Sequence, residues 1–114
     1  MIQLSPTTKA MVAIQPVDFR KGIRGLKSVC QEVLKQNPES RVLFIFKNKK
    51  KNAIKILVYD GQGFWLCLKR LSKGTFPWWP EDVKRAKEID HNKIHLLINA
   101  AIEREFSEDW KRLV

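Results

Sequence analysis

Most of the residues in this sequence that could do chemistry are cationic. The chain has 22 lysines and arginines against 12 aspartates and glutamates, which gives a formal net charge of +10 and an isoelectric point near 9.9. Such a surface attracts polyanions over a long range, and nucleic acid is the commonest partner of a small basic domain. A domain that is merely basic, without a polyanionic partner, is the alternative explanation.

The first cluster of basic residues follows an aspartate. Behind Asp18 come Arg20, Arg24 and Lys27, at spacings i, i + 4 and i + 7, with Lys21 beside them. Side chains at these spacings project from one side of a helix, and a helix N-terminus attracts anions. The cluster therefore predicts a phosphate-binding stripe, although a solvated helix face has the same pattern.

Two further basic clusters lie in segments expected to be β-structure. Lys49, Lys50 and Lys51 occupy a turn that we expect to be mobile, and Lys69 and Arg70 lie at a strand end. Lysines on a turn can contact a nucleic-acid backbone, but an ordinary solubilising turn has the same composition. The three clusters form one surface only if the fold brings them together.

Two tryptophans could contribute stacking. Trp78 and Trp79 lie between two prolines, which restrict the backbone of this segment. Indole rings stack on exposed bases, but they also pack in cores and in pockets of partner proteins. Trp78 and Trp79 are therefore candidates for base stacking or for contact with a partner, whereas Phe64 and Trp65 are expected in the core.

Patterns typical of catalysis or metal binding are absent from the sequence. His91 and His95 are four residues apart, without a glutamate between them or a third ligand nearby, which makes a poor metal site. Cys30 and Cys67 form no C-x-x-C pair, and both are expected to behave as small buried hydrophobes. The acidic residues do not converge as two-metal phosphoryl transfer requires, and no nucleotide-binding loop or nucleophile elbow is present. The sequence predicts neither an enzyme nor a cofactor.

Length and segment composition predict a single domain in the cytoplasm. A chain of 114 residues corresponds to one typical domain. The N-terminus lacks the charged start and apolar run of a secretory signal, and two thiols suit a reducing compartment. No stretch approaches the ~18 consecutive apolar residues of a membrane span, so no membrane contact is expected.

The helix and strand that carry the first cluster are predicted from periodicity. Residues 11–14 predict a short strand. Apolar residues at helical spacing from Phe19 to Leu34 predict one long helix at about residues 18–36. Asp18 is its expected N-cap, and Pro38 ends it.

A meander and a second helix complete the predicted fold. Residues 41–47, 53–59 and 64–71 are rich in β-branched and aromatic types and predict strands, with Asp60-Gly61 as a hairpin turn. The predicted fold class is α+β, an antiparallel meander of three to four strands packed with one long N-terminal helix and a C-terminal helix.

The C-terminal part of the chain is less defined by its pattern. Residues 81–89 are charged and ambiguous. Asp90 predicts the cap of a C-terminal helix that begins at about residue 91. Residues 104–114 either extend this helix or form a mobile tail. The whole chain, 1–114, is expected to be one accessory domain.

Several motifs together resemble a known family. The run Asp18-Phe19-Arg20-Lys21-Gly22, followed by Gly25-Leu26, resembles a D-x-R-K-G-x-x-G-L opening. Next come Lys55-Ile56-Leu57, Asp60-Gly61-Gln62-Gly63 and Lys69-Arg70-Leu71, which resemble K-I-L-x-x-D-G-x-G and K-R-L. Phe76 and Trp78 resemble an F-x-W landmark. Together these motifs resemble those of the TnpB accessory proteins of the sixty-six family of bacterial insertion sequences, over about residues 1–80.

This resemblance implies an element-encoded helper of a separate DDE transposase, without a catalytic site of its own. Together with the charge, it predicts a non-catalytic DNA-binding accessory protein of insertion-sequence transposition. Its expected partners are DNA, at the ends of the element, the transposase and other element-encoded proteins. The alternative is a protein-interaction module that docks on the transposase without direct DNA contact. No oligomeric state is predicted.

Overall fold

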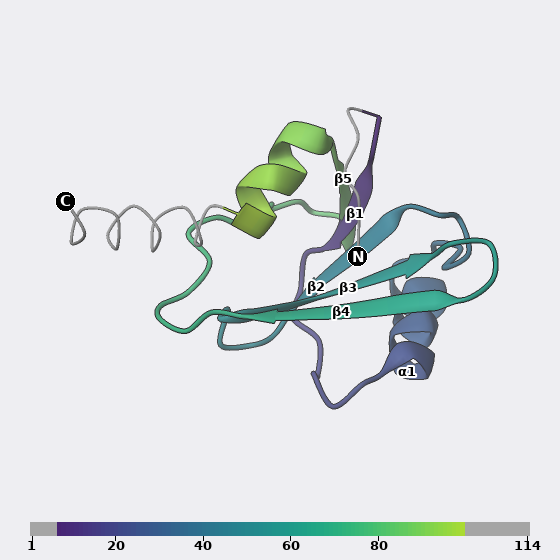
Figure 1. The fold of residues 1–114 in the computed structure, drawn as a ribbon, viewed down its shortest axis with the longest axis horizontal. Helices are drawn as coiled ribbons and strands as arrows, with labels where there is room; N and C mark the ends of the chain where they lie inside the picture. Colours follow the sequence, from purple (N-terminus) through teal and green to yellow (C-terminus); the bar gives the residue numbers. More distant parts are fainter. Residues whose placement is uncertain (1–6, 100–114) are drawn as a thin grey trace.

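A five-stranded sheet with helical segments on both faces forms the described part of the chain (Figure 1). The computed structural model describes residues 7–99. The strands are β1 (Ala10–Ala13), β2 (Leu43–Lys47), β3 (Ala53–Tyr59), β4 (Phe64–Arg70) and β5 (Ala86–Ile89), in the sheet order β4-β3-β2-β1-β5. β1 runs parallel to β2, and the other neighbours are antiparallel. The predicted α+β class is confirmed.

The predicted meander is formed by β2, β3 and β4. β3 has the predicted bounds, whereas β2 begins at Leu43 and β4 ends at Arg70. At the hairpin, the Asp60 carboxylate accepts hydrogen bonds from the backbone N–H groups of Gln62 and Gly63, at 2.8 and 2.9 Å. Gly61 has a φ of +101°, a conformation that favours glycine, so the Asp-Gly signal predicted this turn correctly.

The long helix predicted at about residues 18–36 is wrong in its extent. α1 spans only Ile23–Ser28 and continues as the π-helical segment η1 (Val29–Val33). The N-cap of α1 is Gly22, and not Asp18 as predicted. Asp18 instead accepts a hydrogen bond from the backbone N–H of Arg20 at 2.9 Å. An aspartate that bonds to its local backbone offers an alternative to helix, which delays the start of α1.

The ambiguous residues 81–89 contain a strand that the sequence did not predict. β5 pairs with β1 along its whole length, from Ala10 opposite Ile89 to Ala13 opposite Ala86. It extends the predicted meander of three to four strands to a sheet of five within residues 7–99. Lys87 and Glu88 make the segment too polar for a strand signal, so the pairing depends on the tertiary fold.

Both faces of the sheet carry a buried apolar cluster. The cluster under α1 and η1 consists of Ala13, Leu26, Cys30, Leu34, Phe44, Phe46 and Leu57. The cluster on the other face consists of Ala10, Val12, Leu43, Ile45, Ile54, Ile56, Leu71, Phe76, Ile89, Ile94 and Leu97. Every position of β2 is buried, because β2 is central and covered on both faces.

The C-terminal helix covers the second cluster. Residues 91–99 are helical and lie on the opposite side of the sheet from α1 (Figure 1). Asp90 accepts a hydrogen bond from the backbone N–H of Lys93 at 3.1 Å, which confirms the predicted cap. No helix in the described part of the chain has the length and apolarity of a membrane span. The predicted tail, 104–114, lies outside the described residues.

Candidate nucleic-acid interface

One open hollow, which we call the basic depression, lies at the end of the sheet where β2 and β4 end and β3 begins. Its volume is about 550 Å³. It is lined by Pro16, Val17, Asp18, Phe19, Asn48, Lys49, Lys50 and Arg70. Lys49, Lys50 and Arg70 are exposed, and they come from two of the clusters found in the sequence. The order β4-β3-β2 places the turn after β2 beside the end of β4, so the sheet topology brings these cations together.

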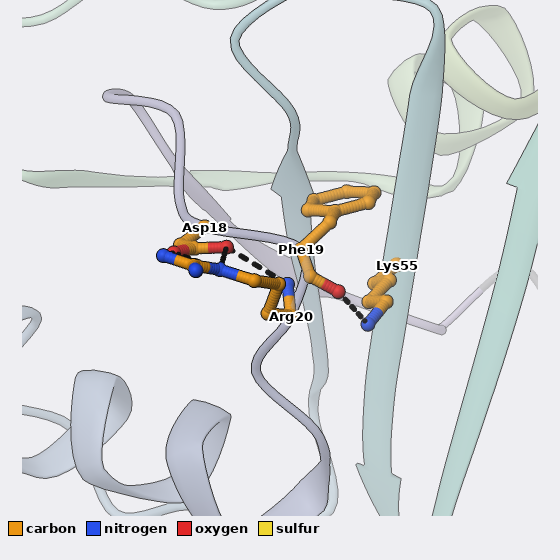
Figure 2. Close-up of polar contacts among 4 residues, drawn as sticks. All are labelled: Asp18, Phe19, Arg20 and Lys55. Atoms are coloured by element: carbon orange, nitrogen blue, oxygen red, sulfur yellow. Dashed lines mark hydrogen bonds and ion pairs between the residues drawn. The ribbon is translucent and has the colours of Figure 1, made fainter.

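Lys55 of β3 holds the segment that forms one wall of the basic depression. Its Nζ donates hydrogen bonds to the carbonyl oxygens of Phe19 and Lys21, both at 2.8 Å. It also lies 5.2 Å from the centre of the Phe19 ring. Figure 2 shows the Lys55 side chain directed at the Phe19 carbonyl. The lysine of the K-I-L motif therefore positions the D-x-R-K-G motif.

Asp18 and Arg20 form an ion pair on the exposed side of this wall (Figure 2). The distance from Arg20 Nη2 to Asp18 Oδ2 is 2.6 Å, and Arg20 Nε also donates to this carboxylate. Hydrogen bonds from the side chain and backbone of Arg20 lower the pKa of Asp18 from 3.8 to about 2. The same contact raises the pKa of Arg20. Arg20 precedes α1, so it does not form a helical stripe with Arg24 and Lys27.

The other cations of the first cluster do not line the basic depression. Arg24 is exposed on α1, and Lys21 is exposed before it. A Cβ added to Gly25 would lie 2.9 Å from Lys21 Cβ, so Gly25 allows α1 to pack closely against this side chain. Lys27 Nζ lies 4.7 Å from the ring centre of Phe64, at the opposite end of β4 from Arg70.

Asn48 orders the turn that carries the lysines. Its Oδ1 accepts hydrogen bonds from the backbone N–H groups of Asn52 and Ala53, both at 3.1 Å, and its Nδ2 donates to Asn52 Oδ1 at 2.6 Å. Only 9% of Asn48 is exposed. Asn48 and Lys55 are structural parts of the site that the sequence analysis did not identify. An asparagine at a strand end is a turn signal, but the sequence does not show that it is buried.

The predicted tryptophans lie beside a second hollow, of about 460 Å³, that also includes Lys51. The indole N–H of Trp79 donates to the Ala13 carbonyl at 3.0 Å, and Lys47 Nζ lies 5.1 Å from the Trp79 ring centre. Burial, and then the charge of Lys51, lower the pKa of Lys47. Trp79 is therefore anchored to β1, whereas Trp78 is 37% exposed.

Lys69 and Arg70 point to opposite faces of the sheet. Lys69 lies opposite Ile54, whose side chain belongs to the cluster under residues 91–99, and its Nζ donates to the Ile98 carbonyl. Arg70 is the next residue, and successive side chains of a strand alternate between faces. Of this pair, only Arg70 lines the basic depression.

Within residues 7–99, no group of three or more histidine, cysteine, aspartate or glutamate side chains could hold a metal ion. His91 and His95 contact each other, with their Nε2 atoms 3.1 Å apart. Both cysteines are free. Burial raises the pKa of the Cys30 thiol to about 12, and Cys67 is half-buried. Trp65, which was expected in the core, is instead 53% exposed.

Comparison with known proteins decides the family. A family model described as IS66 Orf2-like protein matches residues 8–107. The chain belongs to the IS66 Orf2-like family. It is 32% identical over 111 residues to the uncharacterized protein y4hO of Sinorhizobium fredii, covering 97% of this chain and 96% of that protein. It is 36% identical over 80 residues to the uncharacterized protein y4jC of the same organism, covering 70% and 68% respectively. No solved structure matches the chain.

Membership in the IS66 Orf2-like family confirms the resemblance expected from the sequence motifs. It makes the chain an accessory protein associated with an insertion sequence. In this IS66 Orf2-like chain, the D-x-R-K-G and K-I-L motifs meet where Lys55 contacts the carbonyl groups of Phe19 and Lys21. The K-R-L motif contributes Arg70 to the basic depression.

Proposed function

We propose that this IS66 Orf2-like protein is a non-catalytic, DNA-binding accessory protein that assists a separate transposase at the ends of the element. The observation that carries the proposal is the basic depression. Lys49, Lys50 and Arg70 line one open hollow, although they come from distant parts of the sequence. Asp18, the carboxylate in the lining, is neutralised by Arg20.

The geometry of the basic depression suits a nucleic-acid backbone. Arg70 can bind a phosphate through two parallel N–H groups, and Lys49 and Lys50 act as point charges beside it. Contacts of this kind set affinity and position but carry no sequence information directly. Asn48 limits the motion of the lysine turn, so less conformational entropy is lost when DNA binds.

The other predicted contacts lie outside the lining of the basic depression. Lys21, Arg24 and Lys51 are exposed and supply further charge, as does Lys27 at the hairpin end. Arg20 and Lys69 already have partners in the protein, so we assign them smaller roles. The same distinction applies to the tryptophans. Trp78 is the better candidate for stacking on a base or contacting a partner, because Trp79 is anchored to Ala13.

Salt dependence of DNA binding tests the proposed function. Binding of the full chain to a duplex of the element end, to a random duplex and to single-stranded DNA would be measured at several salt concentrations. If ~4 phosphates are neutralised, the logarithm of the affinity falls with the logarithm of salt at a slope of about −3 to −4. A slope near zero contradicts binding through phosphate contacts, and no binding at low salt contradicts DNA binding.

A second candidate function is docking on the transposase, which a neighbouring apolar groove favours. The groove has a volume of about 510 Å³ and is lined by Ala13, Gln15, Pro16, Val17, Asp18, Lys21, Val29, Val33, Leu34 and Arg85. Val33 is 40% exposed. An apolar contact is weakened little by salt, whereas exposed charge pairs are screened. Capture of purified transposase that persists at high salt, without DNA binding at low salt, would favour this candidate.

A further inference from the structure

The two edges of the sheet differ in their protection. β5, at one edge, has four residues and includes Lys87 and Glu88. β4, at the other edge, has seven residues, and among residues 7–99 it pairs with β3 alone. Trp65 and Leu68 of β4 are 53% and 55% exposed. A long edge strand with exposed apolar side chains is a template for pairing with another strand.

The hydrogen bonds of the hairpin fix which backbone groups of β4 face outward. At one end the Asp60 N–H donates to the Gly63 carbonyl at 3.0 Å, and at the other the Leu71 N–H donates to the Asn52 carbonyl at 2.8 Å. Antiparallel pairs alternate between hydrogen-bonded and non-hydrogen-bonded, so residues 65, 67 and 69 bond to β3. The N–H and C=O groups of Phe64, Leu66, Leu68 and Arg70 therefore point away from the sheet.

We propose that two copies of this chain pair through β4, antiparallel and about a two-fold axis at Cys67, which joins two five-stranded sheets into one of ten strands. In this register Phe64 lies opposite the partner's Arg70, and Leu66 lies opposite the partner's Leu68. All four of these residues have outward backbone groups, so each pair can form hydrogen bonds. This register also pairs all seven residues of β4.

The side chains of β4 are complementary to those of a second copy in this register. The exposed Leu68 packs on the partner's Leu66, and the Phe64 ring faces the partner's Arg70. On the other face, Trp65 lies opposite the alkyl stem of the partner's Lys69, since the Lys69 ammonium is bonded to the Ile98 carbonyl of its own chain. Aromatic–cation and apolar cross-strand pairs of this kind stabilise antiparallel sheets. The contact is isologous and closes as a dimer, whereas pairing β4 with the partner's β5 would form an open chain.

The symmetry of the dimer places the two basic depressions where both can contact DNA. Only this consequence of the dimer rests on the proposed function. The two-fold axis is perpendicular to the sheet, so both basic depressions face the same side. The two Arg70 residues are separated by six strand positions, which is about 20 Å along β4. One stretch of DNA backbone could therefore contact both copies.

The oligomeric state of the full chain without DNA tests the dimer. Analytical ultracentrifugation over a range of concentrations is expected to show a monomer–dimer equilibrium. Leu68→Lys is expected to weaken the dimer at least ~10-fold, because it places a charge against the partner's Leu66. Val83→Lys is the matched control, since Val83 is fully exposed and lies outside β4, and it should leave the dimer unchanged. A monomer at every concentration, or a dimer that Leu68→Lys leaves intact, overturns the proposal.

Oxidative cross-linking tests the register without a variant of Leu68. Cys67 should lie beside the partner's Cys67 in a non-hydrogen-bonded pair, where cross-strand side chains are closest. Copper-phenanthroline treatment is expected to give a disulfide-linked dimer in the wild type and none in Cys67→Ser. Cys30 is buried and should not react. A wild-type dimer without the Cys67 cross-link overturns this register, and none of these results depends on DNA binding.

Discussion

The ammonium group of Lys55 lies 2.8 Å from the carbonyl oxygen of Phe19 and 5.2 Å from the centre of the same residue's ring. One side chain of β3 thus holds both the backbone and the aromatic group of the segment before α1. This segment forms a wall of the basic depression. The contact explains how a sheet strand positions a loop that is distant in sequence.

Lys55→Met should destabilise the fold. The substitution keeps an apolar stem but removes the donor from the carbonyls of Phe19 and Lys21. Loss of this charge-assisted contact is expected to lower the free energy of unfolding by ~1–3 kcal/mol. Urea denaturation would measure it, with Lys93→Met, at an exposed helical position, as a control expected to change it by within ~0.5 kcal/mol. Equal stability of the two variants would contradict this role.

Asp18→Asn should change how stability depends on pH. The pKa of Asp18 is lowered from 3.8 to about 2 by hydrogen bonds from Arg20, so its ionised form favours the folded state. This contribution is fully present above about pH 4 and is lost as the pH falls through about 2. The difference in unfolding free energy between wild type and Asp18→Asn should therefore shrink from about pH 5 to about pH 2. If the unfolding free energies of the two proteins change in parallel with pH, the ion pair does not stabilise the fold.

Asn48→Ala should loosen the lysine turn. It removes the acceptor of the Asn52 and Ala53 N–H groups and leaves the buried Ala53 N–H without that side-chain contact. We expect a loss of ~1–3 kcal/mol in the free energy of unfolding. Hydrogen exchange at residues 49–53 should also accelerate more than exchange in α1. Unchanged exchange in the turn would mean that Asn48 does not order it.

The apolar pattern predicted the meander but not the true extent of the first helix. Phe19 and Ile23 have helical spacing, but the backbone between them is bonded to Lys55 of β3. Lys55 is distant in sequence, so a local pattern of apolar residues does not reveal this contact. The Asp60-Gly61 turn was predictable because its chemistry is local. β5 was not, because a polar segment of four residues becomes a strand only by pairing with β1.

The candidate site was predicted as residue types but not as an arrangement. The sequence identified Lys49, Lys50 and Arg70, yet their proximity follows from strand order and not from spacing. It also favoured Arg20 as a helix-terminal phosphate ligand, whereas Arg20 lies before α1 and pairs with Asp18. The ion pair arises from a turn whose geometry the pattern could not specify.

This arrangement changes which lysines and arginines should matter most for DNA binding. From the sequence alone, Arg20→Ala plus Lys21→Ala is expected to weaken DNA binding more than Lys49→Ala plus Lys50→Ala, because Arg20 and Lys21 would lie at the start of a helix. In the structure Arg20 lies before α1 and pairs with Asp18, so we expect the opposite order. The salt slope should fall by about 2 in the Lys49 and Lys50 variant, because each lysine that contacts a phosphate accounts for about 1. Fluorescence anisotropy titrations at several salt concentrations would measure this, with thermal melts to establish folding. A larger loss for Arg20 and Lys21 would move the centre of the site to the segment before α1.

The most direct test of the account compares two variants that each lose three positive charges. Lys49→Ala, Lys50→Ala and Arg70→Ala together remove the cations of the basic depression. Lys9→Ala, Lys84→Ala and Lys93→Ala together remove three exposed cations that do not line it. Affinity for DNA would be measured for both at one low salt concentration. We expect a loss at least ~10-fold greater in the first variant, and equal losses in two folded proteins would contradict a DNA-binding site at the basic depression.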